Sequence, residues 1–293
     1  MISYNSKEWW YFIFKLHRGD TIKTLFIFML ILAGFTALVA WLELYHWKLP
    51  KDHPLRSLSL LHTSLSFVLS LLLVFRTNTA YDRWWEGRKL WGGLVNSSRN
   101  MAIKINALIP SSHKEHRDFF RKAIPLYAKI LKSHLALETT RLELDSEAHP
   151  ELGNLDYSKH LPNQVAMLIA KRLFRVQQEG IITSEQLLML NNELNNFTDT
   201  CGACERIKNT PIPLSYSVFI KKFIFIYSVT LPFGYVFNLE FWAIPVVLFI
   251  FFVLASLELI AEEIEDPFGG DENDLPLEKI VGTITRNIEE CLA

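Results

Sequence analysis

The chain has 293 residues, of which half are apolar and 21% are charged, and its formal net charge at pH 7 is −1. This length allows one large domain or two ordinary ones. The near-zero net charge excludes the strong basic field of a nucleic-acid-binding protein, and the charged fraction argues against a chain that lies wholly within a membrane. Cys201 and Cys204, in the sequence CGAC, have neither a second ligand pair for zinc nor a redox-type βαβ context. We therefore expect buried free thiols.

Four segments reach or approach the length of about 20 apolar residues that a helix needs to cross a bilayer. They lie at about 24–45, 58–75, 223–237 and 241–261. The third is short and contains Pro232. We expect four transmembrane helices, paired as an early and a late hairpin.

Basic residues in the connections orient these four helices. The connection between the last two has no Lys or Arg, whereas the regions after Phe75 and before Phe223 are rich in both. The positive-inside rule therefore predicts that the middle section and both termini are cytoplasmic. Lys48, Lys51 and Arg56 in the first connection weaken this prediction.

The section at about 76–215 is predicted to be helical. Its stretches HRDFFRKAIPLYAKILKSHLALE and QVAMLIAKRLFRVQQEG repeat apolar residues on a 3.6-residue face. Thr183 and Gln186 form a capping-box pattern at the start of a further helix. A polar connector lies at roughly 140–162, and no β-alternation of useful length occurs. The chain is therefore predicted to be all-α, with a membrane half and a cytosolic half built as a single unit over 1–293.

The segment FRTNTAYDRWWEGRKLW, at 75–91, follows the second apolar run without a proline or a turn signal. Its good helix formers predict that one helix crosses the membrane and continues for many turns into the cytoplasm. Charged residues one turn apart, such as Arg83 and Glu86, are expected to form some local ion pairs. Some of the tryptophans should be buried between helices or subunits.

Two stripes run along the second apolar segment. One is small and polar and consists of Ser59, Thr63, Ser66 and Ser70. The other is bulky and apolar and consists of Phe67, Leu71 and Phe75. In a monomeric bundle the small stripe is a helix-packing surface, and the bulky one faces lipid or core. In an assembly around an axis either stripe can line a pore, and a bulky stripe makes a constriction that gates by dewetting.

Sequence motifs of enzymes are absent from the chain. It contains no nucleophile elbow, no phosphate-binding glycine loop and no pair of His residues flanking a Glu at zinc spacing. The acidic cluster at 262–266 suggests a paired-carboxylate enzyme, but such clusters are more typical of a solvated helix end. We predict that the protein is not an enzyme and has no cofactor.

Three longer motifs occur in a fixed order relative to the apolar segments: FRTNTAYDRWWEGRKLWG, CERIKNTPIPLSY and AEEIEDPFGGDENDLPL. Together they resemble the bestrophin family, specifically its bacterial members, and the resemblance covers roughly residues 5–285. It implies a homopentameric ion channel of the bacterial inner membrane, with four membrane helices per subunit. The single pore would run along the five-fold axis, lined by the second membrane helix. The implied partners are other copies of the chain, the lipid bilayer and the permeating monovalent ions.

The resemblance also assigns pore residues. The narrow neck of the family maps onto Phe67, Leu71 and Phe75, which selects the bulky stripe and leaves the polar stripe to pack beside it. The cytosolic aperture maps onto Glu185, where relatives often have an aliphatic residue. Five carboxylates there would concentrate cations, although the first turn of a helix also favours acids.

Animal bestrophins bind calcium in the acidic stretch that follows PFG. Asp271 and Asp274 lie in that region here, with fewer acids than in animal relatives, and the resemblance to bacterial members implies no calcium requirement. The implied function is passive conduction of small monovalent ions, with Na⁺ and K⁺ favoured. Two alternatives stay open: an anion (chloride) channel of the same architecture, and a membrane-anchored interaction protein without a pore.

Overall fold

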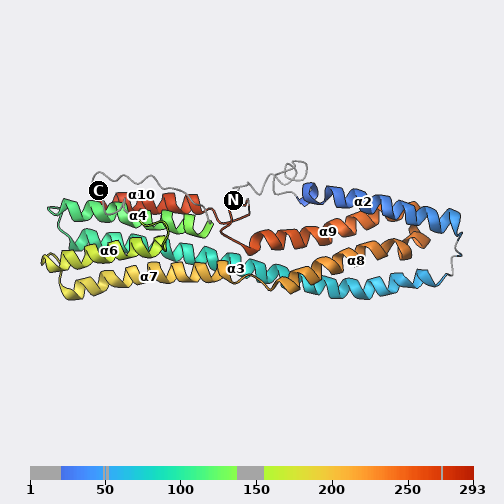
Figure 1. The fold of residues 1–293 in the computed structure, drawn as a ribbon, viewed down its shortest axis with the longest axis horizontal. Coiled ribbons are helices and arrows are strands. Elements are labelled where there is room, and N and C mark those ends of the chain that lie inside the picture. Colours follow the sequence, from blue (N-terminus) through green and yellow to red (C-terminus); the bar gives the residue numbers. More distant parts are fainter. Residues whose placement is uncertain (1–20, 49, 51–52, 137–154, 272) are drawn as a thin grey trace.

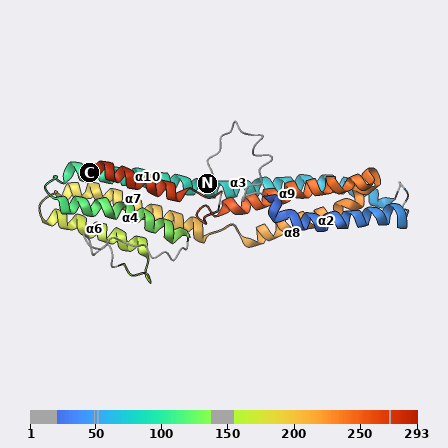
Figure 2. The ribbon, with the colours of Figure 1, turned by 90° about the horizontal axis from the view of Figure 1, so that it is seen from above.

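The computed structural model describes residues 21–48, 50, 53–136, 155–271 and 273–293. In these ranges every regular element is a helix, which confirms the predicted all-α class. Most of the predicted polar connector at 140–162 lies outside the described residues. The helices form two bundles that are placed end to end along one long axis (Figures 1 and 2).

The first bundle, which we call the apolar half, contains the predicted membrane segments. Its helices are α2 (Thr21–Trp41), the π-helix that extends it (Leu42–His46), the first part of α3 (Leu58–Leu108), α8 (Leu214–Leu239) and α9 (Ala243–Glu265). The second bundle, the polar half, combines the rest of α3 with α4 (Lys114–Ala136), α6 (Leu161–Gln178), α7 (Ser184–Asn209) and α10 (Leu277–Leu292). Since α10 packs against α3 and α4, the polar half extends beyond the predicted range 76–215.

Helix α3 has 51 residues and belongs to both halves. At about 1.5 Å per residue it is about 76 Å long, which exceeds a hydrocarbon core of about 30 Å by far. No proline interrupts α3, and it ends before Ile109, whose extended backbone precedes Pro110. The predicted unbroken passage from the apolar run into the charged segment is therefore confirmed.

Three helical stretches among the described residues are long and apolar enough to span a membrane: Thr21–His46, Pro54–Leu108 and Leu214–Glu265. The third is a hairpin, because α8 and α9 pack side by side after the chain reverses near Glu240, where φ is +50° (Figure 1). Helix α8 begins well before the predicted start at 223. Pro232 lies inside this helix, where it is buried against neighbouring helices.

Each half has its own hydrophobic core. In the polar half one cluster joins all five helices, with Trp91, Phe120 and Phe197 among its fully buried side chains. In the apolar half smaller clusters lie between α2, α3, α8 and α9. Cys201 and Cys204 are buried free thiols of the polar half, as predicted, and burial raises the pKa of each thiol to about 12. Both thiols are therefore protonated and unreactive at neutral pH.

The two halves meet at a buried charged junction. The Arg76 side chain is 1% exposed and pairs with Glu258 (Nε to Oε1, 3.5 Å) and with Glu265 (Nη2 to Oε2, 2.7 Å) on α9. Glu265 also accepts a hydrogen bond from the backbone amide of Ile212 at 2.6 Å. One arginine thus ties α3 to α9 and, through Glu265, to the linker that precedes α8.

Arg83, two turns farther along α3, links helices at the same junction through hydrogen bonds. Its guanidinium donates to the backbone carbonyl oxygens of Glu265 (3.1 Å) and Ile207 (2.6 Å), at the C-terminal ends of α9 and α7. Such terminal carbonyls lack partners within their own helices. The predicted local pairing of Arg83 with Glu86 is wrong, because α7 packs on α3 and brings Arg206 within 2.9 Å of Glu86.

Candidate pore-lining face

Helix α3 keeps two distinct faces along its whole length. The buried face contains Leu69, Leu73, Arg76, Ala80, Gly87, Trp91, Leu94, Met101 and Ile105. The exposed face contains Phe67, Leu71, Phe75, Asn78, Asp82, Trp85, Lys89, Asn96 and Ile103. Successive members of each set are three, four or seven residues apart, which places each set on one side of the helix. The exposed side, which we call the α3 stripe, therefore runs unbroken from the apolar half into the polar half.

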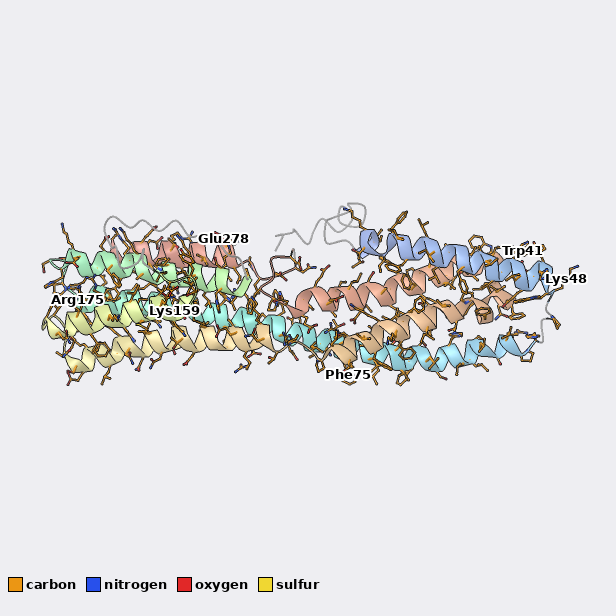
Figure 3. The ribbon with its side chains drawn as sticks, viewed as in Figure 1. Trp41, Lys48, Phe75, Lys159, Arg175 and Glu278 are labelled. Carbon is orange, nitrogen blue, oxygen red and sulfur yellow. The ribbon has the colours of Figure 1, made fainter. Side chains whose placement is uncertain are left out.

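The three residues predicted to form a neck all lie on the α3 stripe. Phe67 is 72% exposed, Leu71 is 46% exposed and Phe75 is 57% exposed, and Phe75 lies near the middle of the molecule (Figure 3). Of the three membrane-length stretches, the one that contains α3 is also the least covered by the rest of the chain. In its most apolar 18-residue segment 17% is buried, against 28% in the corresponding segments of the other two stretches. This apolar surface must contact lipid, another subunit or a pore, since the described chain covers only the opposite face.

Two of the small polar residues beside the neck satisfy their hydroxyl groups within α3. Thr63 Oγ1 donates to the carbonyl oxygen of Ser59 at 2.9 Å, and Ser66 Oγ donates to that of Thr63 at 2.7 Å. Ser59 and Ser66 are half-buried, whereas Thr63 and Ser70 are exposed. The hydroxyl groups of Thr63 and Ser66 need no external hydrogen-bond partner, and the small side chains of the stripe allow a neighbouring helix to approach closely.

The charged pair that follows the neck was not singled out from the sequence. Arg76 comes directly after Phe75, but its side chain lies on the opposite side of α3 and reaches Glu258 in the interior. The signal that points to this pair is Glu258 itself, an ionisable residue directly after the uncharged stretch 243–257 of α9. Arg76 is therefore part of the junction between the halves and does not belong to the exposed stripe.

Glu185 lies at the far end of the polar half, where α3 and α6 end and α7 starts (Figure 1). Leu108, at the same end, is about 50 Å along α3 from Phe75. The predicted capping box is present: Thr183 Oγ1 accepts from the Gln186 amide at 3.3 Å, and Gln186 Oε1 accepts from the Thr183 amide at 2.9 Å. Glu185 is exposed, and its hydrogen bond with the Thr183 side chain lowers the pKa of its carboxyl group. This carboxylate is charged at neutral pH.

The turn after α9 contains the two acids that lie in the region of the animal calcium clasp. Asp274 is 2% exposed, and its Oδ2 accepts hydrogen bonds from the backbone amides of Gly270 at 2.5 Å and Asp271 at 2.6 Å. Gly270 has a φ of +112°, which glycine adopts readily. Burial raises the pKa of Asp274 to about 6. The Asp274 carboxyl group therefore organises the turn and ionises less readily than an ordinary aspartate, while Asp271 is exposed.

The acidic cluster at 262–266 is held in separate structural contacts. Glu262 pairs with Lys221 of α8 at 2.8 Å. Glu263 accepts a hydrogen bond from Asn273 Nδ2 at 2.6 Å, and Glu265 belongs to the junction described above. These carboxylates face different partners, so they do not form the pair that general acid–base chemistry requires.

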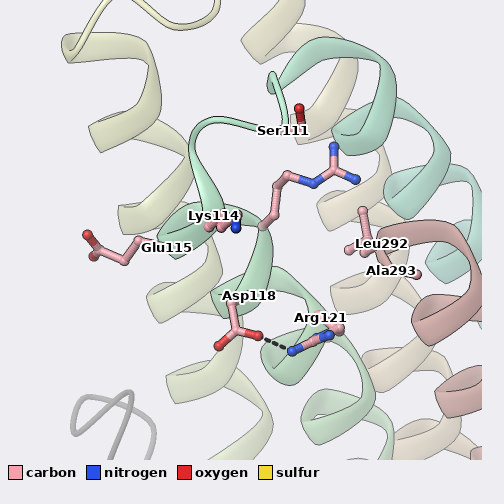
Figure 4. A pocket seen from close by; sticks show the side chains of 8 residues that line it. Ser111, Lys114, Glu115, Asp118, Arg121, Leu292 and Ala293 are labelled. Carbon is pink, nitrogen blue, oxygen red and sulfur yellow. Dashed lines mark hydrogen bonds and ion pairs between the residues drawn. The ribbon is translucent and has the colours of Figure 1, made fainter.

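A cavity of about 570 Å³ lies at the far end of the polar half, between the start of α4 and the end of α10 (Figure 4). Asp118 and Arg121 in its lining form an ion pair. Arg117 donates to the carbonyl oxygen of Ile109 at 3.1 Å and to Asn106 Oδ1 at 2.5 Å. Arg117 thus holds the connection between α3 and α4, and we assign the cavity no part in conduction.

Comparisons with known proteins connect this geometry to a family. The family described as Bacterial/Fungal Bestrophin protein matches residues 1–290. A voltage-dependent anion channel-forming protein of Nostoc is 38% identical over 288 residues, which are 97% of this chain and 92% of that protein. A protein of the same description from Synechocystis is 37% identical over 233 residues, or 78% of this chain and 75% of that protein. A solved bestrophin homologue from Klebsiella pneumoniae has a TM-score of 0.77 at 25% identity, over 91% of this chain and 98% of that chain.

These matches confirm the resemblance that the three motifs indicated. Together with the apolar helices they identify a membrane protein. The expected preference for cations is not supported, because the two similar proteins are named for anion channels, which fits the alternative. The neck residues and Glu185 stay predictions.

Proposed function

Since this chain belongs to the bacterial and fungal bestrophin family, we propose that it is the subunit of a membrane ion channel and not an enzyme. The observation that carries the proposal is α3. One unbroken helix presents uncovered bulky apolar side chains in the apolar half and mostly polar side chains beyond it. Copies arranged around an axis parallel to α3 would enclose a pore lined by the α3 stripe.

The assembly that we propose is a homopentamer. Two hollows lie beside the α3 stripe: one of about 340 Å³ between α3 and α9, lined in part by Val74 and Leu257, and one of about 930 Å³ between α3 and α10, lined in part by Trp85 and Lys279. Hollows with exposed apolar side chains along an uncovered helix are suited to receive a neighbouring subunit. The aromatic side chain of Trp85, 46% exposed, is of a type enriched at such interfaces.

In the proposed orientation α2, the first part of α3, α8 and α9 cross the bacterial inner membrane as four helices. The polar half and both termini are then cytoplasmic. Thr21, at the start of α2, shares a hydrogen bond of 2.8 Å with Ser256, near the end of α9. Since α10 belongs to the polar half, the start of α2 and the helix α10 both lie on the polar-half side of the apolar half. Lys221 and Lys222 lie in the first turns of α8, on that side, as the positive-inside rule expects.

The neck would control conduction through the bulk of its side chains. Phe67, Leu71 and Phe75 have no oxygen or nitrogen atom that can replace the water around an ion. An ion must pass with its hydration shell, and a narrower apolar ring raises the barrier by excluding water. Discrimination between ions of the same charge should therefore be modest.

Two observations favour opposite signs of the conducted charge. In a pentamer Glu185 would form a ring of five carboxylates that concentrates Na⁺ and K⁺. The names of the Nostoc and Synechocystis proteins instead favour chloride. The reversal potential across a KCl gradient separates them: a value close to the K⁺ equilibrium potential supports cation conduction, and one close to the Cl⁻ equilibrium potential supports the anion alternative.

The proposal is tested by measuring assembly and flux on the same purified protein. Native mass measurement should give a species of five 34.0 kDa chains. Liposomes that contain this species should pass small monovalent ions, and protein-free liposomes should not. A monomer without flux would contradict the proposal and leave the membrane-anchored interaction protein as the function.

We also propose that conduction does not require calcium. The supporting observation is that the Asp274 carboxyl group is 2% exposed, accepts two backbone amides at Oδ2 and has a raised pKa, which makes it a poor calcium ligand. Flux should be the same with calcium and with a calcium chelator. Flux that disappears with the chelator and returns with added calcium would overturn this proposal.

A further inference from the structure

Three side chains from separate helices of the polar half meet at one point. His134 lies in the last turn of α4, His160 is the N-cap of α6, and Glu205 lies on α7. The Nε2 atoms of both histidines lie 2.6 Å from the same carboxylate oxygen, Oε1 of Glu205, and the two imidazole rings are 4.6 Å apart. The three candidate ligand atoms all lie within 4.8 Å of one another.

We propose that His134, His160 and Glu205 bind a divalent transition-metal ion of the zinc class. Two imidazoles and one carboxylate are a donor set that zinc accepts, usually with water in a fourth position. The side chains are 30%, 33% and 28% exposed, in that order, so the site opens to solvent and admits both the ion and a water ligand. This role is separate from conduction, because the three residues belong to α4, α6 and α7 and not to the α3 stripe.

The geometry needs only a small adjustment to receive the ion. Metal–ligand bonds of about 2.0–2.1 Å at tetrahedral angles separate the ligand atoms by about 3.3 Å. The nitrogen–oxygen distances of 2.6 Å must therefore open slightly, and rotation of the Glu205 side chain can accomplish this. Lys208, one turn after Glu205, donates to the backbone carbonyl oxygens of His134 and Leu135 and so fixes the end of α4 next to α7.

Coordination of the ion requires a change of tautomer at His160. His160 Nδ1 accepts the amide of Asn163 at 3.2 Å, so the ring proton lies on Nε2 and is donated to Glu205. Coordination through Nε2 displaces this proton, and the ring stays neutral when Nδ1 takes it up in place of the Asn163 bond. Binding of the ion through Nε2 therefore costs one backbone hydrogen bond at the start of α6.

The bound ion would fasten the end of α4 to the start of α6 and to α7. His134 and His160 flank the connection between α4 and α6. A ligand that binds the folded protein and not the unfolded chain raises its stability. Zinc should therefore raise the melting temperature of the polar half.

The experiment uses the full-length purified protein, freed of metal by a chelator and then titrated with Zn²⁺ in a calorimeter. The expected result is one saturable site per subunit. His134→Ala and His160→Ala should each weaken binding by at least about tenfold. His113→Ala is the matched control, because His113 lies in the polar half outside the cluster, and it should bind as the unaltered protein does.

Co²⁺ provides a readout that needs no variant. The visible absorption of Co²⁺ intensifies and shifts when a four- or five-coordinate protein site replaces its water shell, and Zn²⁺ should reverse the change. No saturable Zn²⁺ binding together with an unchanged Co²⁺ spectrum would overturn the proposal. Binding of equal affinity and stoichiometry in the His134→Ala/His160→Ala protein would also overturn it.

Discussion

The apolar and polar halves share helix α3 but are stabilised in different ways. In the polar half five helices bury one continuous core, so hydrophobic burial within the chain holds the helices together. In the apolar half large side chains such as Phe28 and Ile31 of α2 are exposed, so they add little to burial within the chain. Close approach of the helix backbones takes the place of a large buried core there. A Cβ atom at Gly234 of α8 would lie 3.0 Å from the backbone nitrogen of Ser59. Close backbone packing is the expected solution where lipid replaces water outside the bundle.

The junction between the halves should be the most sensitive point of the molecule. Arg76→Ala would leave Glu258 and Glu265 without their cation, and removal of one partner from a buried pair costs about 3–5 kcal/mol. The exposed pair of Arg206 and Glu86 is the matched control, and Arg206→Ala should cost about 0–1 kcal/mol. Thermal unfolding of both variants in detergent measures the difference. Equal shifts would show that the two halves are joined without the help of this arginine.

The turn beside the junction should make the stability depend on pH. Burial raises the pKa of Asp274 from 3.8 to about 6, so folding favours its protonated form. The contribution of protonated Asp274 to the free energy of unfolding is fully present below pH 3.8. It is lost as the pH rises to about 6, and the loss is at most about 3 kcal/mol. Asp274→Asn keeps an oxygen for the amides of Gly270 and Asp271 but does not titrate. Its melting temperature should therefore rise relative to that of the unaltered protein as the pH increases through this window, and parallel profiles would contradict the assignment.

A pair of glycine substitutions compares the packing of the two halves directly. Gly234→Ala would place a methyl group against the backbone of Ser59, and such overpacking costs about 1–3 kcal/mol. Gly202→Ala on α7 meets no atom within 4 Å and should stabilise the protein by about 0.5–1 kcal/mol, because alanine favours a helix. Melting temperatures that move in the same direction would show that the helices of the apolar half are not closely packed at this point.

The smallest expected effect is on ion preference at the far end of the polar half. Glu185→Gln removes the proposed ring of charge without a change in size, so the ratio of cation to anion permeability should fall. Glu289→Gln, an exposed acid on α10, is the matched control and should leave the ratio unchanged. Single-channel reversal potentials measure both variants. An unchanged ratio in Glu185→Gln would place the aperture elsewhere or deny it a role in selectivity.

Local patterns in the sequence were sufficient to predict much of this structure. The absence of proline between residues 58 and 108 predicts the unbroken helix α3, and the spacing of Thr183 and Gln186 predicts a capping box. The position of the neck residues on one face follows from the helical repeat alone. These features depend on residues within a few turns of each other.

Features that depend on packing between distant segments were not predicted. Arg83 bonds to carbonyl groups of α7 and α9, and Arg76 turns inward, because helices far along the chain lie beside α3. The cluster of His134, His160 and Glu205 likewise requires three helices to be in place. Sequence spacing carries no signal for such contacts.

We propose that the bulky apolar side chains on the α3 stripe form the narrowest part of the pore. Single-channel recording of Phe75→Ala, and of Phe67→Ala and Leu71→Ala combined, tests it most directly. Phe28→Ala is the matched control, since Phe28 is 60% exposed on α2, close to the 57% of Phe75. We expect a higher conductance in both neck variants and no change in the control. Unaltered conductance in both neck variants would contradict it.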